Sequence, residues 1–599
     1  MIEKIIIFDF EIYKYDTLLG AKVFDSSGQH YYQSWDIDEI RNFYKENVNN
    51  LWVGHNNKGY DNYMLESVIS GKNPYNKSVE IVEKNIRPSW LRLPLINYDI
   101  MDDTFFSLKS TEAWAGKNIS ETQVDFRIDR PLNDEEKELV ESYNRDDLDQ
   151  TSDNFFDRDI QGGFNAKLDL ITMFNLDLKY LTRSGASIAA KILGAKAIPG
   201  IEYQYIKPKL YDTLRLKNEQ LLDFYINEKF RNGEHLTLNI CGTDHVFGGG
   251  GCHAGDKCDV PKALYLDVSG YYNLIMMLYN LFPRTIPEEG KEIYKELYYK
   301  QLEYKKTAPE KRPALKIVLL AVWGSTLAQY SDFYDPQVGS LITITGQIFT
   351  VDLLEKLEGL IKVVQTNTDG IIVEPLNWDT YDLIINKVEE WEKRTGFTIK
   401  KDLVYDIHQR DVNNYMYRDA KGNIHVKGEA VKHYDSLEHP LGNKIYDSKE
   451  SMIIAKCIVE YFMNNKSPEK TIEENKRNLR MFQQVCKKGS FQYTEYELLN
   501  IKTNEISTTR LQGVNRVFAL KSNELIGTVQ KHKIDNRGIH KKSKVSNLPD
   551  SVFVYDDEIL SNETVDHLID KIDYNYYINR AYERICEFLD IPQIKDIKL

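Results

Sequence analysis

Residues 4–10 constrain the fold more than any other segment of the sequence. They read KIIIFDF, an apolar run rich in β-branched residues, which predicts a strand buried on both faces. Further strand-like runs lie in 51–70 and 95–110, and 133–149 predicts a helix that opens at Asn133-Asp134 with acidic residues in its first turn. Strands that alternate with helices indicate an α/β domain that extends to about residue 160.

The pattern changes after this domain. Residues 165–230 look mostly helical, and a glycine break, FGGGG, follows at 247–251. It is not a phosphate-binding P-loop, because no Lys-Ser/Thr pair comes after it. A chain of 599 residues is too long for one core, and the length alone predicts about four domains.

The second half of the chain mixes strands and helices. A strand is predicted over 262–268, and two helical stretches over 287–330 are interrupted near Pro309. Residues 361–374, IKVVQTNTDGIIVE, predict a hairpin with a tight polar turn. The remaining chain from 435 contains amphipathic helices such as 451–463 and a basic stretch near 521–547.

Composition narrows the class of protein. The formal charge of −14 argues against a protein that simply coats DNA, but not against an enzyme with carboxylates in metal sites. Six cysteines are too few for a disulfide scaffold, and we see no signal peptide or membrane-spanning run, so we expect a cytoplasmic monomer without a membrane partner. Zinc stays a minor alternative for four residues whose spacing matches no regular finger: Cys241, Cys252, His253 and Cys258.

Carboxylates recur in the first domain in an ordered pattern. Asp9 and Glu11 are two apart on a predicted strand, so both point to the same face and can share a divalent cation. Asp61 follows another apolar stretch, and Tyr143 lies one helical turn before Asp147. Each pair alone is common on solvated surfaces, whereas the ordered set is not.

This order, Asp-x-Glu, then Asn-x3-Tyr-Asp, then Tyr-x3-Asp, resembles the three motifs of DnaQ-type proofreading 3′→5′ exonuclease domains. Those domains use two metal ions, one to activate water and one to steady the leaving oxygen. By this resemblance Asp9, Glu11 and Asp147 hold the metals, and Asp61 is the remaining carboxylate. The residues that orient the water or contact the frayed 3′ end are then Tyr143, Asn56 and Tyr60.

A second carboxylate set lies in the second half. Asp267 ends an apolar strand, and Asp369 lies at the turn of the predicted hairpin. Two strands that each present a carboxylate are what a two-metal nucleotidyl transferase requires. Between them, a helical segment carries Lys316, which can give a triphosphate leaving group a cationic partner.

These three segments resemble motifs A, B and C of family B DNA polymerases, especially the compact bacteriophage enzymes, with departures. In motif A, Gly270 and Asn273 replace the family's Ser and Pro, and in motif B its Asn-Ser-x-Tyr-Gly is LAVWG at 320–324. In motif C the family's first Asp is Asn367, which leaves Asp369 as the anionic ligand.

The resemblance also assigns the remaining residues. The ring of Tyr272 would pack under the sugar of the incoming nucleotide, and Lys306 and Arg312 would join Lys316 in binding the dNTP. Tyr415 and Lys427 match elements that grip the primer, although Asn413 replaces a family Lys. The basic stretch, which includes Lys541, Lys542 and Arg537, falls in the expected thumb and would contact duplex phosphates.

The expected fold is therefore multidomain α/β and α+β, an RNase H-like exonuclease domain followed by a right-hand polymerase. The expected parts are an exonuclease domain (1–165), a helical connector (166–245), palm (246–285 and 333–434), fingers (286–332), and thumb with the C-terminal region (435–599). Two alternatives remain: an exonuclease whose polymerase half only binds DNA, and a reverse-transcriptase- or primase-like enzyme.

The implied cofactors are Mg²⁺ or Mn²⁺, two per active site. The implied partners are primer-template DNA and dNTPs. The spacing of motifs A, B and C leaves little room for an extra subdomain, so we expect an ordinary nucleic-acid primer and a helicase, single-strand-binding protein or clamp for long synthesis.

Overall fold

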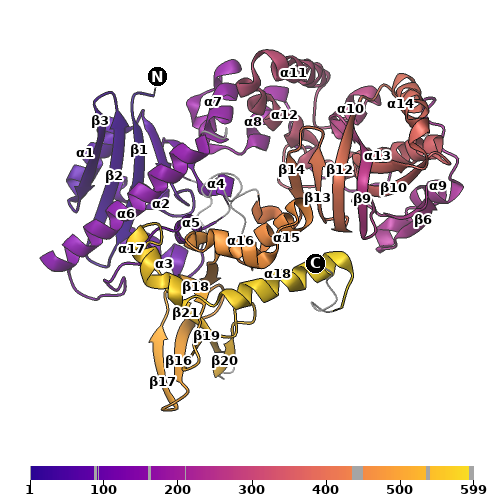
Figure 1. Cartoon of the computed structure of the whole chain (residues 1–599). Helices are drawn as coiled ribbons and strands as arrows, with labels where there is room; N and C mark the ends of the chain where they lie inside the picture. Colours follow the sequence, from indigo (N-terminus) through magenta and orange to yellow (C-terminus); the bar gives the residue numbers. More distant parts are fainter. Residues whose placement is uncertain are drawn as a thin grey trace.

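The computed structural model describes residues 2–86, 91, 93–104, 106–119, 121–159, 163–209, 211–434, 450–534, 538 and 540–592. These residues form four sheets, two large and two small. Figure 1 shows the N-terminal sheet and the large second sheet at opposite sides of the molecule, with the C-terminal sheets below them. The chain is therefore a mixed α/β protein of several parts, as expected.

The N-terminal sheet has five strands: β1 (Ile5–Ile12), β2 (Thr17–Asp25), β3 (Gly28–Ser34), β4 (Leu51–Gly54) and β5 (Ile96–Asp99). Their order is β3-β2-β1-β4-β5, with β1 antiparallel to β2 and parallel to β4. The central place of β1 explains its apolar run, because Ile6 and Ile7 are buried on opposite faces. The strand predicted over 4–10 is confirmed.

Helices cover both faces of this sheet (Figure 1). On one face, apolar side chains of β1 pack against α1 (Ile37–Asn47) and α2 (Asp61–Ile69). On the other they pack against α6 (Asp134–Asp159) and α7 (Gly163–Met173), so the helix predicted from Asn133-Asp134 is confirmed and extends further. The strand-like interpretation of 51–70 and 95–110 is wrong beyond β4 and β5. Helix α2 buries Met64, Leu65 and Val68, which have helical spacing. Over so short an apolar run this spacing cannot be told from that of a strand.

The second large sheet has nine strands, in the order β14-β13-β12-β9-β11-β10-β8-β7-β6. At its centre β9 (Cys258–Val268) pairs with β11 (Gly370–Pro375) and β12 (Ile399–Asp411). The other strands are β6 (Leu236–Ile240), β7 (Thr243–Phe247), β8 (Cys252–Ala254), β10 (Ile361–Asn367), β13 (Asn414–Asp419) and β14 (Ile424–Lys427). Because β6 and β7 belong to this sheet, the segment 166–245 is not helical throughout. The predicted hairpin over 361–374 is confirmed as β10 and β11.

Four helices lie between β9 and β10: α10 (Tyr271–Leu278), α11 (Glu288–Thr307), α12 (Arg312–Gly324) and α13 (Pro336–Leu357). The predicted break near Pro309 is the short 3₁₀ turn between α11 and α12. Among the described residues, α13 alone is long and apolar enough to cross a membrane, and 94% of that apolar window is buried inside the protein. It packs as a core helix against α10.

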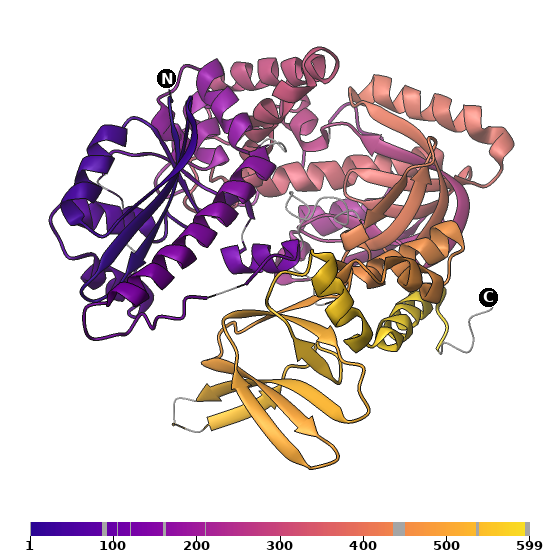
Figure 2. The ribbon, with the colours of Figure 1, turned by 60° about the vertical axis from the view of Figure 1, so that its left-hand side comes forward.

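The C-terminal region combines helices with two small sheets. Helix α15 (Met452–Asn464) packs against α18 (Tyr574–Leu589). One sheet contains β15 (Gln484–Lys487), β18 (Val514–Ala519) and β21 (Val552–Val554), and the other contains β16 (Tyr493–Asn500), β17 (Glu505–Arg510), β19 (Leu525–Ile534) and β20 (His540–Lys544). Figure 2 shows these sheets below the rest of the molecule.

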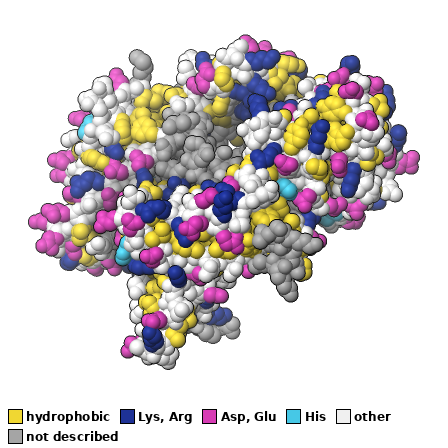
Figure 3. Space-filling view, in the orientation of Figure 1, with side chains coloured by type: hydrophobic (Ala, Val, Ile, Leu, Met, Phe, Trp, Pro, Cys, Tyr) yellow, Lys and Arg dark blue, Asp and Glu magenta, His cyan; other side chains and the backbone are white. Residues whose placement is uncertain are grey.

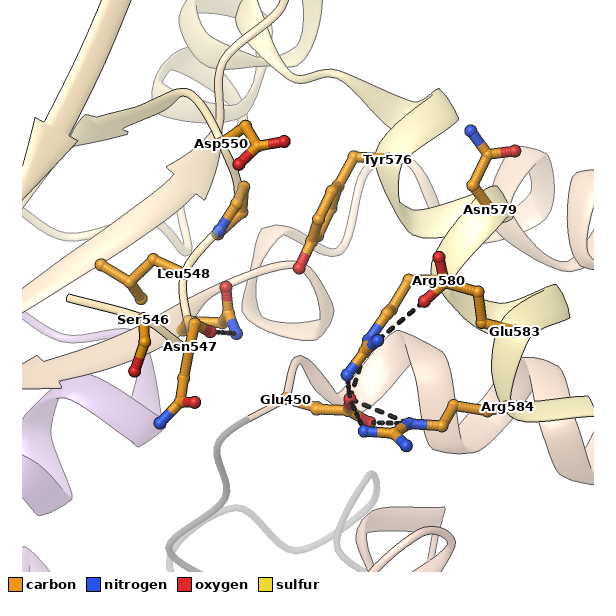
Figure 4. A pocket seen from close by; sticks show the side chains of 12 residues that line it. Glu450, Ser546, Asn547, Leu548, Asp550, Tyr576, Asn579, Arg580, Glu583 and Arg584 are labelled. Carbon is orange, nitrogen blue, oxygen red and sulfur yellow. Dashed lines mark hydrogen bonds and ion pairs between the residues drawn. The ribbon is translucent and has the colours of Figure 1, made fainter. Parts of the chain in front are cut away.

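A cavity of about 480 Å³ separates α18 from the segment 546–550 in this region (Figure 4). On its wall, Glu450 accepts hydrogen bonds from Arg580 and Arg584, which project from α18. Arg580 also donates to Glu583 at 2.7 Å. The arginines are thus engaged by carboxylates, and they tie α18 to the start of α15.

Candidate functional site

A compact carboxylate cluster lies on the N-terminal sheet. One ligand oxygen from each of Asp9, Glu11 and Asp147 lies within 4.8 Å of the other two. Asp9 and Glu11 share a face of β1, as the two-residue spacing predicts, and α6 crosses that face and brings Asp147. Within the described ranges no other group of three or more possible metal ligands is found.

Burial and mutual repulsion dominate the electrostatics of this cluster. Burial, followed by the charge of Asp147, raises the pKa of Asp9 to about 7. Burial and then the charge of Asp9 raise the pKa of Glu11 well above its ordinary value. Carboxylates packed this closely, two of them with raised pKa values, gain from a cation, and hard divalent ions prefer such oxygen ligands. The cluster therefore fits Mg²⁺ or Mn²⁺.

Asp61 begins α2 beside the cluster without joining it. Its Oδ1 accepts a hydrogen bond from the main-chain N of Phe10 at 3.2 Å. Burial and then the charge of Asp9 raise its pKa well above the ordinary value. Tyr143 lies on the same face of α6 as Asp147, and burial followed by the charge of Asp147 raises the pKa of its hydroxyl. The structure thus brings together five of the seven residues predicted for this site: Asp9, Glu11, Asp61, Tyr143 and Asp147.

Lys109 is a further member of the site that the sequence analysis missed. Its Nζ lies 2.5 Å from Asp147 Oδ1, 3.3 Å from Glu112 Oε2 and 4.8 Å from the ring centroid of Tyr143. Burial acts to lower its pKa, but the charges of Asp147 and Glu112 outweigh burial and raise it. Lys109 lies on α5 (Leu108–Ala115). The one signal for it in the sequence is the spacing Lys109-x-x-Glu112, which is that of an ion pair along a helix.

Asn144 is a second missed neighbour. Its Nδ2 donates to Asp9 Oδ2 at 3.1 Å, and its side chain occupies the space above Gly20 on β2. A Cβ at Gly20 would lie 1.6 Å from Asn144 Oδ1, so only glycine permits this contact. The close approach of α6 to the sheet, and with it the position of Asp147, depends on Gly20.

The loop between β4 and α2 carries Asn56 and Tyr60. Asp99, at the end of β5, holds this loop by accepting from the main-chain N of Asn56 at 2.8 Å and of Lys58 at 2.9 Å. Asn56 is exposed with a positive φ of 62°, and the Tyr60 hydroxyl lies 2.7 Å from Ser78 Oγ. Sequence analysis gave Asp99 no role, because no motif contains it.

The second predicted site forms on the nine-stranded sheet. Asp267 on β9 pairs in register with Gly370 on β11, and the main-chain N of Val268 donates to the carbonyl O of Asp369 at 3.0 Å. Burial, and then in part the charge of Asp267, raises the pKa of Asp369, and burial raises that of Asp267. Asp267, near the end of β9, and Asp369, in the turn before β11, are therefore neighbours although they are distant in sequence, and the charge of Asp267 acts on Asp369.

The turn that carries Asp369 explains one departure from motif C. Thr368 has a positive φ of 60°, and the N of Asp369 donates to the carbonyl O of Asn367 at 2.8 Å. At Gly370, where the family has Ser, a Cβ would lie 2.9 Å from the hydroxyl oxygen of Tyr265. A glycine at position 370 therefore leaves room for the side chain of Tyr265 on β9.

The segments that resemble motifs A and B meet between α10 and α12. The ring of Tyr272 stacks on Trp323, with centroids 4.1 Å apart and planes 17° apart. Asn273 accepts a hydrogen bond from the Tyr294 hydroxyl at 2.9 Å. Trp323 stands where motif B of the family has a tyrosine. It therefore packs against Tyr272, the tyrosine of the segment that resembles motif A.

Cations gather at the junction of α11 and α12 (Figure 3). Lys306 lies in the last turn of α11, and Arg312 begins α12 and donates to Gln301 Oε1 at 3.0 Å. Burial, followed by the charges of Arg312 and Lys305, lowers the pKa of Lys316. Like charges that repel one another in this way gain from an anionic ligand.

Tyr415 and Lys427 lie opposite each other on β13 and β14. The charge of Lys427 acts to lower the pKa of Asp369, and the charge of Asp369 acts to raise that of Tyr415, so both residues are near the second site. Lys541 and Lys542 lie on β20 of the C-terminal region, where Lys542 forms an ion pair with Glu497. Arg537 lies outside the described residues.

The zinc alternative finds no support in the arrangement of its residues. The thiol of Cys241 donates to the carbonyl O of Leu354 at 3.4 Å, and Cys252 is fully buried. The four residues form no metal-ligand group among the described parts of the chain. Cys241, Cys252 and Cys258 are all free cysteines.

Of the comparisons with known proteins, the one with solved structures finds similar proteins. The sequence matches no protein-family model and no curated protein. Among solved structures, the chain is similar to the family B DNA polymerase from the hyperthermophilic archaeon Pyrobaculum calidifontis, with 14% sequence identity and a TM-score of 0.42. The alignment covers 100% of this chain and 79% of that one.

Proposed function

We propose that this chain is a DNA-directed DNA polymerase with its own 3′→5′ proofreading exonuclease. The observation that carries the proposal is that Asp267, on β9, lies beside Asp369, in the turn before β11 of the same sheet, while a separate carboxylate cluster lies on another sheet. Two separate acidic sites match the two activities that the motifs predict. Neither site requires residues of the other.

The fold supports the proposed division into domains. Three antiparallel strands followed by two parallel ones, with helices on both faces, agree with an RNase H-like exonuclease domain. We assign the nine-stranded sheet to the palm, α11 and α12 to the fingers, and the C-terminal helices and small sheets to the thumb region. Compact bacteriophage polymerases of family B are the class whose motifs the sequence most resembles.

In the exonuclease, Asp9, Glu11 and Asp147 would hold two divalent ions, which when bound supply an activated water and stabilise the leaving oxygen. Tyr143, on the same helix face as Asp147, would orient the water, and Lys109 would hold Asp147 and offset negative charge as a phosphodiester enters. Asn56 and Tyr60 would contact the unpaired 3′ end.

In the polymerase, Asp267 and Asp369 would hold the divalent ions that lower the pKa of the primer 3′-OH and neutralise the triphosphate. Lys316, with Lys306 and Arg312 nearby, would bind the phosphates of the incoming dNTP. Tyr272 would pack under its sugar, and Tyr415 and Lys427 would position the primer end near Asp369.

Two other functions account for only one of the two sites. An exonuclease whose second half only binds DNA has no need for Asp267 beside Asp369 or for the cations around Lys316. A reverse transcriptase or primase has no need for the buried cluster of Asp9, Glu11 and Asp147. Both are therefore less consistent with the two sites taken together.

The direct test uses purified wild-type protein, a labelled primer on a DNA template, and Mg²⁺. With all four dNTPs we expect extension, and without dNTPs we expect removal of nucleotides from the 3′ end. A parallel reaction on an RNA template measures the reverse-transcriptase alternative. Degradation without any extension would favour the DNA-binding alternative, and extension on RNA equal to that on DNA would contradict the assignment.

A further inference from the structure

Helix α5 links the exonuclease cluster to the C-terminal region. Near its start, Lys109 reaches Asp147. At its other end, the chain turns through Gly116, whose φ is 81°. Figures 1 and 2 show α5 between the N-terminal sheet and the C-terminal sheets. A shift of this helix would therefore move Lys109 relative to the carboxylates.

The end of α5 is held by a buried arginine of the C-terminal region. Arg516, on β18, is completely buried, and its Nη2 donates to the carbonyl oxygens of Ala113 at 3.2 Å and Lys117 at 2.7 Å. Its other nitrogens donate to Gln483 Oε1 and to the carbonyl O of Asp557, both at 2.7 Å. A guanidinium at a helix C-terminus is also favoured by the helix dipole.

Further contacts fix the same end. Gln483 Nε2 donates to the carbonyl O of Trp114 at 3.1 Å, and the N of Ile559 donates to the carbonyl O of Gly116 at 3.0 Å. Trp114 itself is fully buried and packs with Met452. The carbonyl groups that a helix end leaves without partners are thus satisfied mainly by residues distant in sequence.

We propose that Arg516 is a positioning residue for the exonuclease: through α5 it holds Lys109 at Asp147, so that the C-terminal region is a necessary part of the exonuclease site. The inference rests on the exonuclease activity proposed above. It requires that Arg516 affects DNA degradation through Lys109 and leaves nucleotide incorporation unaffected, because α5 packs on α6, β15 and β18 whereas Asp267 and Asp369 belong to the nine-stranded sheet.

The test compares Arg516→Lys, which keeps the charge but loses the forked donor geometry, with wild type in the full-length protein with Mg²⁺. On a single-stranded oligonucleotide we expect kcat for degradation to fall about ten-fold or more, the usual effect of mutating a residue that positions a metal ligand without binding the metal itself. We expect KM for the oligonucleotide and the rate of primer extension to stay unchanged. In a Lys109→Met background, Arg516→Lys should cause no further loss.

Two additional variants keep the test decisive. Gln512→Ala removes the bond from Gln512 Nε2 to the carbonyl O of Ile119 at 2.5 Å, just beyond the end of α5; it is a milder change and should reduce degradation in the same selective way. Arg418→Lys is the matched control, because Arg418 also donates to main-chain oxygen but at Met463, away from α5.

Several results would overturn the inference. These are unchanged degradation by both Arg516→Lys and Gln512→Ala, an equal loss of degradation and extension, losses that add in the double variant with Lys109→Met, or an equal loss in Arg418→Lys. A wild-type protein that extends primers but degrades no DNA would instead overturn the proposed exonuclease, and this inference with it.

Discussion

The ring of Tyr272 lies flat against the indole of Trp323, 4.1 Å away between centroids. Helix α13 also approaches the ring at Gly346, where a Cβ would lie 3.6 Å from Cε1 of Tyr272. The ring therefore packs against both α12 and α13, and these contacts set its orientation. A rigid ring at this position is suited to excluding a bulky substituent on a neighbouring sugar.

We therefore expect Tyr272→Val to raise the incorporation of ribonucleotides relative to deoxyribonucleotides by about ten-fold or more, the scale of a lost steric contact in a pocket. Trp323→Ala should have a smaller effect in the same direction, because the ring stays but loses its support. Tyr272→Phe, which keeps the ring, is the control. Single-nucleotide insertion with rNTP and dNTP measures the ratio, and equal discrimination by Tyr272→Val and wild type would place the exclusion elsewhere.

The exonuclease assignment predicts the outcome of removing two carboxylates together. Asp9→Ala with Glu11→Ala should abolish 3′→5′ degradation, because the remaining Asp147 cannot hold two divalent ions alone. Primer extension should be unaffected, since the second site is on another sheet. Degradation of a labelled single strand measures the effect, and a wild-type rate in the double variant would show that the cluster is not catalytic.

The polymerase assignment predicts the reverse pattern. Asp267→Ala and Asp369→Ala should each remove nearly all nucleotide incorporation and leave degradation intact. Asp259→Asn is a matched control on β9, because Asp259 pairs with His408 away from the site. Substantial extension by Asp369→Ala would mean that Asn367 or another group completes the site, and would require a different assignment of the motif C turn.

The buried cluster also predicts how stability depends on pH without metal. The pKa of Asp9 rises from 3.8 to about 7 on folding, so the folded state favours the protonated acid. The stability from this group is full below about pH 4 and is lost as pH rises through about 7. At pH 8, Asp9→Asn should stabilise the metal-free protein by up to about 4 kcal/mol, the free energy that corresponds to the rise of the Asp9 pKa from 3.8 to about 7.

Thermal unfolding with a chelator, repeated with Mg²⁺, checks this prediction. Added Mg²⁺ should stabilise the wild type at pH 8, since bound ligand stabilises the folded state, and should stabilise Asp9→Asn much less. Near pH 4 the two proteins should have similar unfolding midpoints. A wild type that becomes more stable as pH rises from 4 to 8 without metal would show that the cluster is not strained by its own charge.

Local sequence patterns predicted part of this structure, where the periodicity of apolar residues is enough to define a strand. The strand with Asp9 and Glu11 and the hairpin with Asp369 could be read from short apolar runs, because side-chain alternation fixes which residues share a face. Helix α2 was misread in part, because its apolar residues fit a strand as well as a helix over a short window.

The contacts that the sequence did not reveal are those that depend on tertiary packing. Lys109 reaches Asp147 from α5, a helix whose end is held by Arg516 from a distant part of the chain. Likewise, Gly20 makes room for Asn144 of another element; Gly20 belongs to no motif, and Asn144 occupies a position that the Tyr-x3-Asp motif leaves unspecified. Such residues are visible only once the elements are placed in space.

The last prediction concerns priming and strand displacement. Between Asp267 and Lys316 the chain forms α10, α11, the 3₁₀ turn Pro309–Lys311 and the start of α12. Between Lys316 and Asp369 it forms the rest of α12, then α13 and β10. Every residue from 267 to 369 is described, and these elements belong to the sheet and to the helices packed on it, so no separate subdomain is inserted at either point.

Polymerases that start from a protein and open duplex unaided need an additional element to encircle the template. We therefore expect the purified enzyme to extend an ordinary nucleic-acid primer, to stop soon after meeting a downstream strand, and to need a helicase or clamp for long synthesis. A gapped template with and without a blocking oligonucleotide measures this, and the unblocked gap is the control. The C-terminal sheets could supply the encircling element instead, and in that case the enzyme alone would copy kilobases through duplex from a nick, a result that would refute the prediction.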